Sequence, residues 1–296
     1  MCHPHSSNDG AKGYLGNLAE AQTAALAALR ARVSDGQQQG LLDISSITLS
    51  CDGYGESEDL DRCLLRYLRA HGFDVERTLV ILGENVAWRA QEGTAALRAQ
   101  TPAEVLGVPA AELRALIAAR YPHWLLGDDR RGRPVLLYRY GAFDARALLR
   151  RTTARRLQRY HVWEQEQNAR LLARRARRRR GGGDGSGSGG GAGGASGGSG
   201  CDMDAYSLIL DLQGLGVGQI TSELVALLRY IAETDARHYP RRCATTYVVN
   251  TPPLFGVIWG AIRGCLEGSS ADLRVLSDRK RWQQVRCALV ISLAAL

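Results

Sequence analysis

The chain has 296 residues, of which 45% are hydrophobic, and a formal net charge of +8. A chain of this length and composition can bury a sizeable core, which excludes a small fold that depends on disulfides. Its seven cysteines contain no CxxC pair, which argues against a disulfide framework and a zinc site. Residues 170 to 184 hold seven arginines and one acid, seven minus one giving +6, so the rest carries only +2. The basic character therefore belongs to one segment and does not indicate a nucleic-acid-binding fold.

Residues 1 to 55 are rich in Gly, Ser, Gln and Ala and lack a sustained pattern of large apolar residues. Such a segment buries little apolar area, so we predict a flexible leader with one short helix over residues 18 to 33. The first residues contain no charged region followed by an apolar one, so no secretory signal is predicted. We therefore expect a cytoplasmic protein.

Residues 56 to 120 are predicted to form an all-helical unit. Leu60, Leu64 and Leu68 recur at helical spacing along its first helix. Farther along, the segment from Thr101 to Glu104 is a capping box with proline at the first helical position. These start signals and the apolar spacing predict helices and no strands in this part of the chain.

From residue 121 to residue 284, predicted strands alternate with predicted helices. Helices are predicted over residues 151 to 175 and 219 to 236. Strands are predicted around them, over residues 133 to 138, 206 to 212, 245 to 250 and 273 to 277. This alternation predicts an α/β domain with a largely parallel sheet covered by helices.

Residues 174 to 203 interrupt this domain with an arginine run, 174 to 180, followed by glycine and serine. The glycine-rich part cannot bury apolar area, so we predict a disordered surface loop. The arginines lack interleaved aromatic residues, so no specific nucleic-acid partner is expected. Contact with anionic lipid is a second interpretation, worth roughly 1 kcal/mol for each basic residue near a membrane.

The segment Pro252–Leu266 is predicted to be a helix that is apolar on all sides, with Arg263 as its one charge. Proline suits the first helical position, and Thr251 is placed to cap the first turn. The helix is too short to span a bilayer, which needs about 20 residues, so it must be buried or cover something apolar. The apolar tail, 285 to 296, is also too short to be a membrane anchor.

Several short motifs occur in the order found in one known family, and over residues 58 to 284 the chain resembles CRAL-TRIO lipid-binding proteins of the Sec-fourteen phospholipid transfer type. The motifs are Leu64–Ala70 with Phe73–Val75, Asp129 with Gly132–Val135, Ile209–Gly214, Tyr239–Pro240 and Tyr247–Pro252. The resemblance implies a helical N-terminal unit followed by a sheet domain with an apolar lipid cavity. It also implies that the helix after Pro252 is a movable gate over that cavity.

The resemblance implies a function without catalysis, namely the binding and the transfer or presentation of a hydrophobic lipid at membranes. We expect a monomer with no cofactor that makes transient contact with membrane surfaces. The gate positions fall on Phe255, Trp259 and Ile262. The full set of expected cavity residues is Tyr206, Leu208, Leu210, Tyr247, Val249, Phe255, Ile258, Trp259 and Ile262.

The family's headgroup positions are only partly kept. Of the residues that contact phosphatidylinositol in the family, the resemblance retains a basic residue as Arg242 and a hydroxyl as Ser269 or Ser270. The two small hydroxyl residues that contact a choline headgroup fall on Tyr206 and Leu208. Neither specificity is carried over, and a phospholipid, a sterol or an isoprenoid-like lipid all remain open.

Two further function classes compete with lipid binding. The sequence has no nucleophile elbow, zinc-binding histidine pattern or phosphate loop, so we expect neither an enzyme nor a metal site. The glycines of Gly214–Gly218 follow a strand, but their spacing does not match a dinucleotide-binding loop. The alternative function is a non-catalytic protein-interaction or small-GTPase-regulatory module that has lost its lipid specificity.

Overall fold

The computed structural model describes residues 13–50, 57–181, 204–252, 255–256, 259–260 and 272–276. Two compact units are present, one within Met1–Arg89 and Arg170–Asp204, the other within Ala90–Ala169 and Ala205–Leu296. One boundary lies near the end of α4 (Val75–Glu92), and another lies in the middle of α9 (Ala154–Gly181). The helical region predicted over residues 56 to 120 is therefore divided, because residues 90 to 120 belong to the unit that contains the sheet.

The first unit contains α1 (Glu20–Gln38), α2 (Ser45–Thr48), α3 (Leu60–Ala70) and α4. The prediction of a flexible leader is wrong over residues 13 to 50, because α1 packs on α3 as part of the core. Leu26, Leu29 and Val33 lie on one face of α1, and the last two are fully buried. Three apolar residues at helical spacing are enough to seat a helix when the rest of its surface is polar or small. Residues 1 to 12 and 51 to 55 lie outside the described part.

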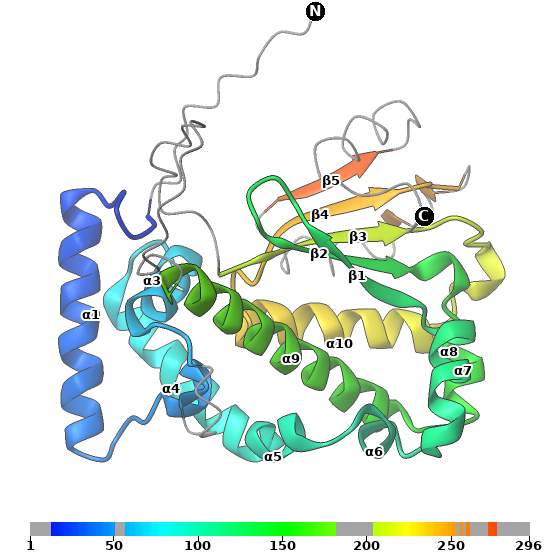
Figure 1. The fold of residues 1–296 in the computed structure, drawn as a ribbon, viewed down its shortest axis with the longest axis horizontal. Helices are drawn as coiled ribbons and strands as arrows, with labels where there is room; N and C mark the ends of the chain where they lie inside the picture. Colours follow the sequence, from blue (N-terminus) through cyan, green and yellow to red (C-terminus); the bar gives the residue numbers. More distant parts are fainter. Residues whose placement is uncertain are drawn as a thin grey trace, which may run out of the picture. The chain divides into compact units, whose positions relative to one another are not determined.

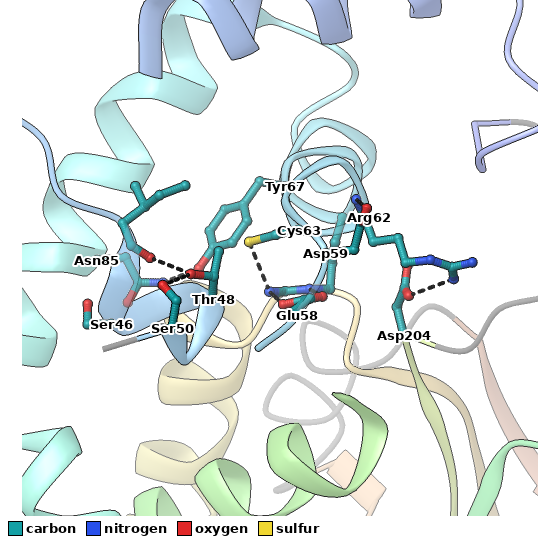
Figure 2. Close-up of polar contacts among 12 residues, drawn as sticks. Ser46, Thr48, Ser50, Glu58, Asp59, Arg62, Cys63, Tyr67, Asn85 and Asp204 are labelled. Atoms are coloured by element: carbon teal, nitrogen blue, oxygen red, sulfur yellow. Dashed lines mark hydrogen bonds and ion pairs between the residues drawn. The ribbon is translucent and has the colours of Figure 1, made fainter. Parts of the chain in front are cut away.

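Buried polar contacts join the segments of the first unit. Figure 2 shows Arg62 directed toward Asp204, with 3.3 Å between Arg62 Nη1 and Asp204 Oδ1. Tyr67 and Asn85 are hydrogen-bonded between α3 and α4. Burying such groups is costly unless each has a partner, so these contacts define how the segments fit together. Asp204 holds the chain to α3 immediately before the third strand.

In the second unit, helical elements precede the first strand and also lie between later strands of the sequence. The capping box predicted at Thr101 is confirmed, with Glu104 N donating to Thr101 Oγ1 and Thr101 N donating to the Glu104 carboxylate. The helical elements are α5 (Thr94–Ala99), α6 (Pro102–Leu106), α7 (Ala110–Arg120), η2 (Tyr140–Ala142), α8 (Ala145–Leu149), the first part of α9, η3 (Val217–Gln219) and α10 (Ser222–His238).

Among the described residues, the sheet has five strands in the order β1-β2-β3-β4-β5. The strands are β1 (His123–Asp128), β2 (Pro134–Arg139), β3 (Tyr206–Asp211), β4 (Cys243–Val249) and β5 (Leu273–Leu276). β1 is antiparallel to β2, and every other pair is parallel. The predicted α/β class with a largely parallel sheet is confirmed. The sequence analysis missed β1, which joins β2 through the charged turn at Asp129.

The two faces of the sheet have different surroundings. Ile209 pairs with Tyr247 and belongs to a buried apolar cluster that also contains Val135, Leu137 and Val249. Leu208 and Leu210 point to the other face, because alternate residues of a strand face opposite sides. On that second face lie α10 and the part of α9 within this unit (Figure 1).

Within the helix predicted over Pro252–Leu266, the described residues 255, 256, 259 and 260 are helical, and Pro252 is not. The rings of Phe255 and Trp259 lie with their centroids 5.2 Å apart, as expected for residues one helical turn apart. Among the described helices, none is long and apolar enough to cross a membrane.

Candidate functional site

A pocket lies between the sheet and its two covering helices in the second unit. Its volume is about 50 Å³. β2, β3, α9 and α10 all contribute to its wall, and phenolic, carboxylate and apolar side chains are mixed along it. The lining residues are Tyr121, Leu136, Tyr138, Tyr140, His161, Gln165, Tyr206, Leu208, Leu210, Ile231 and Asp235.

The carboxylate of Glu164 on α9 lies beside this pocket and is held by three neighbours. Tyr121 Oη donates to it at 3.1 Å and Tyr138 Oη at 3.2 Å, and His123 Nε2 lies 3.1 Å away. Burial raises the pKa of Glu164, and this outweighs the opposite influence of His123, His161 and the two phenols. The carboxyl group of Glu164 is therefore easier to protonate than a solvent-exposed glutamate.

A chain of hydrogen bonds runs from α10 across α9 to β3. Asp235 Oδ1 accepts from His161 Nε2 at 2.7 Å and from Gln165 Nε2 at 2.9 Å. The Tyr206 hydroxyl lies 3.2 Å from Gln165 Nε2 and 3.3 Å from Gln165 Oε1. Burial lowers the pKa of His161, but the Asp235 carboxylate and its hydrogen bond raise it more, so the net shift is upward. The Asp235 carboxylate thus favours the protonated form of this imidazole.

The charges around the pocket disfavour an anionic group. Asp235 is in the lining and Glu164 lies behind it, whereas none of the lining residues that the structure describes is a lysine or an arginine. The basic side chain of His161 is already paired with Asp235. Phosphate groups are held in proteins by arginine, lysine or several backbone N–H groups. The wall offers instead phenol and carboxylate oxygens, which suit neutral or hydrogen-donating groups.

Of the predicted cavity residues, the structure places Tyr206, Leu208 and Leu210 together in the wall of this pocket. Tyr247 and Val249 lie elsewhere, in the apolar cluster on the opposite face of the sheet. The expectation that these two residues share a cavity with the other three is therefore wrong. Tyr247 pairs with Ile209, whose side chain points away from the face that carries Leu208 and Leu210. On the pocket face, the residues of β4 that pair with Leu208 and Leu210 are Thr246 and Val248.

The remaining predicted site residues are only partly described. Arg242 is buried, and its backbone carbonyl accepts from Tyr206 N at 2.9 Å, which places it at the start of β3. Phe255 and Trp259 are described and half-buried. Ile258, Ile262, Ser269 and Ser270 lie outside the described residues, so the gate and the headgroup positions on them stay predictions.

Sequence reasoning missed the polar side chains that α9 and α10 contribute to the pocket. His161, Glu164 and Gln165 lie on the buried side of α9, where a helix normally carries apolar residues. Asp235 occupies a corresponding position on α10. The available signal was the His161–Gln165 spacing of four, which puts both side chains on one helical face. Nothing in the sequence indicated that Tyr121 would reach the same pocket.

The family model of the CRAL/TRIO domain matches residues 119–284, which include the whole sheet and the pocket. The chain belongs to the CRAL/TRIO domain family. This match excludes most of the first unit, since α1, α2, α3 and α4 all precede residue 119.

Curated relatives agree with this assignment. The chain is 25% identical over 217 residues to the phosphatidylinositol/phosphatidylcholine transfer protein SFH7 of Arabidopsis thaliana, covering 73% of this chain and 35% of the relative. It is 27% identical to the Sec14 cytosolic factor of Schizosaccharomyces pombe, covering 78% and 70%. The chain thus spans about a third of the length of the plant relative. Among solved structures, that of Sfh5 is 16% identical, with a TM-score of 0.49 over 72% of this chain and 64% of the other.

Proposed function

We propose that this protein binds a hydrophobic lipid and transfers or presents it at membranes, without catalysis. The observation that carries the proposal is a pocket between sheet and helices in a domain of the CRAL/TRIO family. The printed names of its relatives, which describe phosphatidylinositol and phosphatidylcholine transfer, support it. Leu136, Leu208, Leu210 and Ile231 supply apolar wall to this pocket.

Binding a whole lipid requires the pocket to enlarge. A site for a small molecule encloses roughly 300 to 1,000 Å³, and the pocket has about 50 Å³. The predicted gate helix over Pro252–Leu266 is the segment that we propose to move. Each CH₂ group removed from water contributes about 0.8 kcal/mol, so a lipid of two dozen such groups supplies ample free energy for this opening.

We also propose that the protein works in the cytoplasm as a monomer and touches membranes transiently. The arginine run at the end of α9 would favour anionic membrane surfaces, because Arg174, Arg177 and Arg178 are exposed there. The lack of lysine and arginine among the described lining residues argues against a strongly anionic phosphoinositide headgroup inside the pocket.

Lipid mass spectrometry on the protein purified from cells tests the proposal. Leu210→Lys places a charge in the pocket and should remove a bound lipid, whereas Leu41→Lys is the control, because Leu41 is 78% exposed and lies in the other unit. Loss of a stoichiometric lipid in the first variant only would support the proposal. A folded wild-type protein with no enriched lipid would refute it and favour the protein-interaction module.

The interaction module is tested by the same pair of variants. If the protein captures a partner protein and Leu210→Lys retains that partner while carrying no lipid, the two functions are separate. A partner lost with the lipid would mean that the loaded state is the one recognised.

A further inference from the structure

We infer that the pocket selects a lipid whose polar end is a single hydroxyl group, with Asp235 as the acceptor and Tyr206 as the size limit. This inference rests on the proposed lipid-binding function and names the ligand class. It combines three observations: the partners of Asp235, the position of the Tyr206 ring and the composition of the wall.

Asp235 has an oxygen to offer the ligand. Both described hydrogen bonds to this carboxylate, from His161 Nε2 and Gln165 Nε2, end on Oδ1. Among the described residues no hydrogen bond to Oδ2 is present, and Asp235 is part of the pocket wall. A carboxylate oxygen only accepts, so Oδ2 recognises a group that donates a hydrogen, such as a hydroxyl. Hydrogen bonds to an ionised acceptor are among the stronger ones.

His161 and Gln165 orient this carboxylate toward the pocket. Each donates to the same oxygen, which fixes the plane of the carboxylate between α9 and α10. Both act on the ligand through Asp235, so their role is positioning.

Tyr206 limits the size of the group that can reach Asp235. Tyr206 is 4% exposed and belongs to the wall, and its hydroxyl is held by Gln165, which also contacts Asp235. The space left is about 50 Å³, enough for a hydroxyl and a few carbon atoms. Removing the phenol ring would free on the order of 100 Å³. The ring therefore fills space beside Asp235 that a phosphate ester headgroup would need.

The test compares three lipids with identical acyl chains: diacylglycerol, its methyl ether and phosphatidylcholine, each with one fluorescent chain. Affinities are measured for the full-length protein with vesicles of uncharged carrier lipid. We expect the wild type to bind diacylglycerol at least about tenfold more tightly than the methyl ether, which cannot donate to Asp235, or phosphatidylcholine.

Three variants separate the two roles. In Tyr206→Ala, the preference for diacylglycerol over phosphatidylcholine should fall at least about tenfold, whereas Tyr206→Phe, which keeps the ring volume, should preserve it within about twofold. Tyr206→Leu should shift the same ratio by a smaller amount, and it replaces Tyr206→Ala in the comparison if the alanine variant does not fold. Asp235→Asn should reduce the preference for diacylglycerol over its methyl ether. Ratios of affinities are used because a general loss of stability changes both members alike.

The outcomes are distinct. If the wild type binds all three lipids equally, or if Tyr206→Ala and Tyr206→Phe give the same ratio, the selectivity inference is wrong while lipid binding stands. If neither the wild type nor any variant binds a lipid, the proposed function is wrong, and so is the ligand class that rests on it. A preference for diacylglycerol over phosphatidylcholine that falls in Tyr206→Ala and is preserved in Tyr206→Phe supports the size limit.

Discussion

Replacing Asp235 with asparagine removes a charge from the pocket while keeping the shape of the side chain. Asp235 Oδ1 accepts from His161 at 2.7 Å and from Gln165 at 2.9 Å, and the paired side chains of His161 and Asp235 are 9% and 13% exposed. The amide oxygen of asparagine can still accept both bonds, but without the charge. Hydrogen bonds to charged groups stabilise by about 1.5 to 3 kcal/mol and neutral ones by about 1, so we expect a loss of about 1 to 3 kcal/mol.

The loss should depend on pH in a defined direction. The folded-state pKa of His161 lies above its ordinary value of 6.5 because of Asp235. The charged pair therefore stabilises the folded state fully below the pKa of the unfolded histidine, and this contribution disappears as pH rises through the folded-state pKa. In Asp235→Asn the main remaining influence is burial, which lowers the pKa of His161. The difference between wild type and variant should be larger near pH 6 than near pH 9.

Urea unfolding followed by circular dichroism at the two pH values measures this difference, and NMR titration of His161 reports its pKa directly. Glu233→Gln is the control, because Glu233 lies on the same helix, carries the same charge and is exposed. An equal loss at both pH values, or an unchanged His161 pKa in Asp235→Asn, would refute the reasoning.

Three further substitutions test the fold and the pocket. Leu29→Ala should destabilise the protein by about 3 kcal/mol in urea unfolding, because Leu29 is fully buried, whereas Leu41→Ala should have almost no effect; equal effects would contradict the assignment of α1 to the core. Thr221→Ala should lower the free energy of unfolding by about 1 kcal/mol, because Thr221 Oγ1 accepts from Leu224 N at the start of α10. Serine at this position should recover that stability, because its hydroxyl can accept the same bond. Glu164→Gln should destabilise the protein more at pH 5 than at pH 8, because a carboxyl group with a raised pKa contributes stability while it is protonated and loses that contribution as pH rises. A larger loss of thermal stability at pH 8 than at pH 5 would contradict the burial of this group.

Local sequence signals predicted the elements that depend on neighbouring residues. The capping box at Thr101, the strand from Tyr206 and the amphipathic helix α10 were all expected, because caps and apolar periodicity act over a few residues. α1 was underestimated, because its few apolar residues gain their value only from the partner face on α3. β1 was missed for a similar reason, since a short strand with a glycine is stabilised by its pairing with β2.

The candidate site shows the same division. Tyr206, Leu208 and Leu210 could be assigned to one face from strand alternation and from the family resemblance. That Tyr247 and Val249 face the other way depends on the register between β3 and β4, which the sequence does not reveal. His161, Glu164 and Asp235 could not be distinguished from surface charges, because their burial depends on which helical face meets the sheet.

The sequence by itself determined the α/β class, the order of the main strands and helices, and the membership of this domain in its family. These follow from hydrophobic periodicity and short motifs, which are properties of consecutive residues. Only the tertiary structure decided that α1 belongs to the core, that the predicted cavity residues divide between two faces of the sheet, and that two helices bring a carboxylate and an imidazole into the pocket. Those features depend on strand register and on packing between residues distant in the chain, and such contacts form only when the elements are assembled.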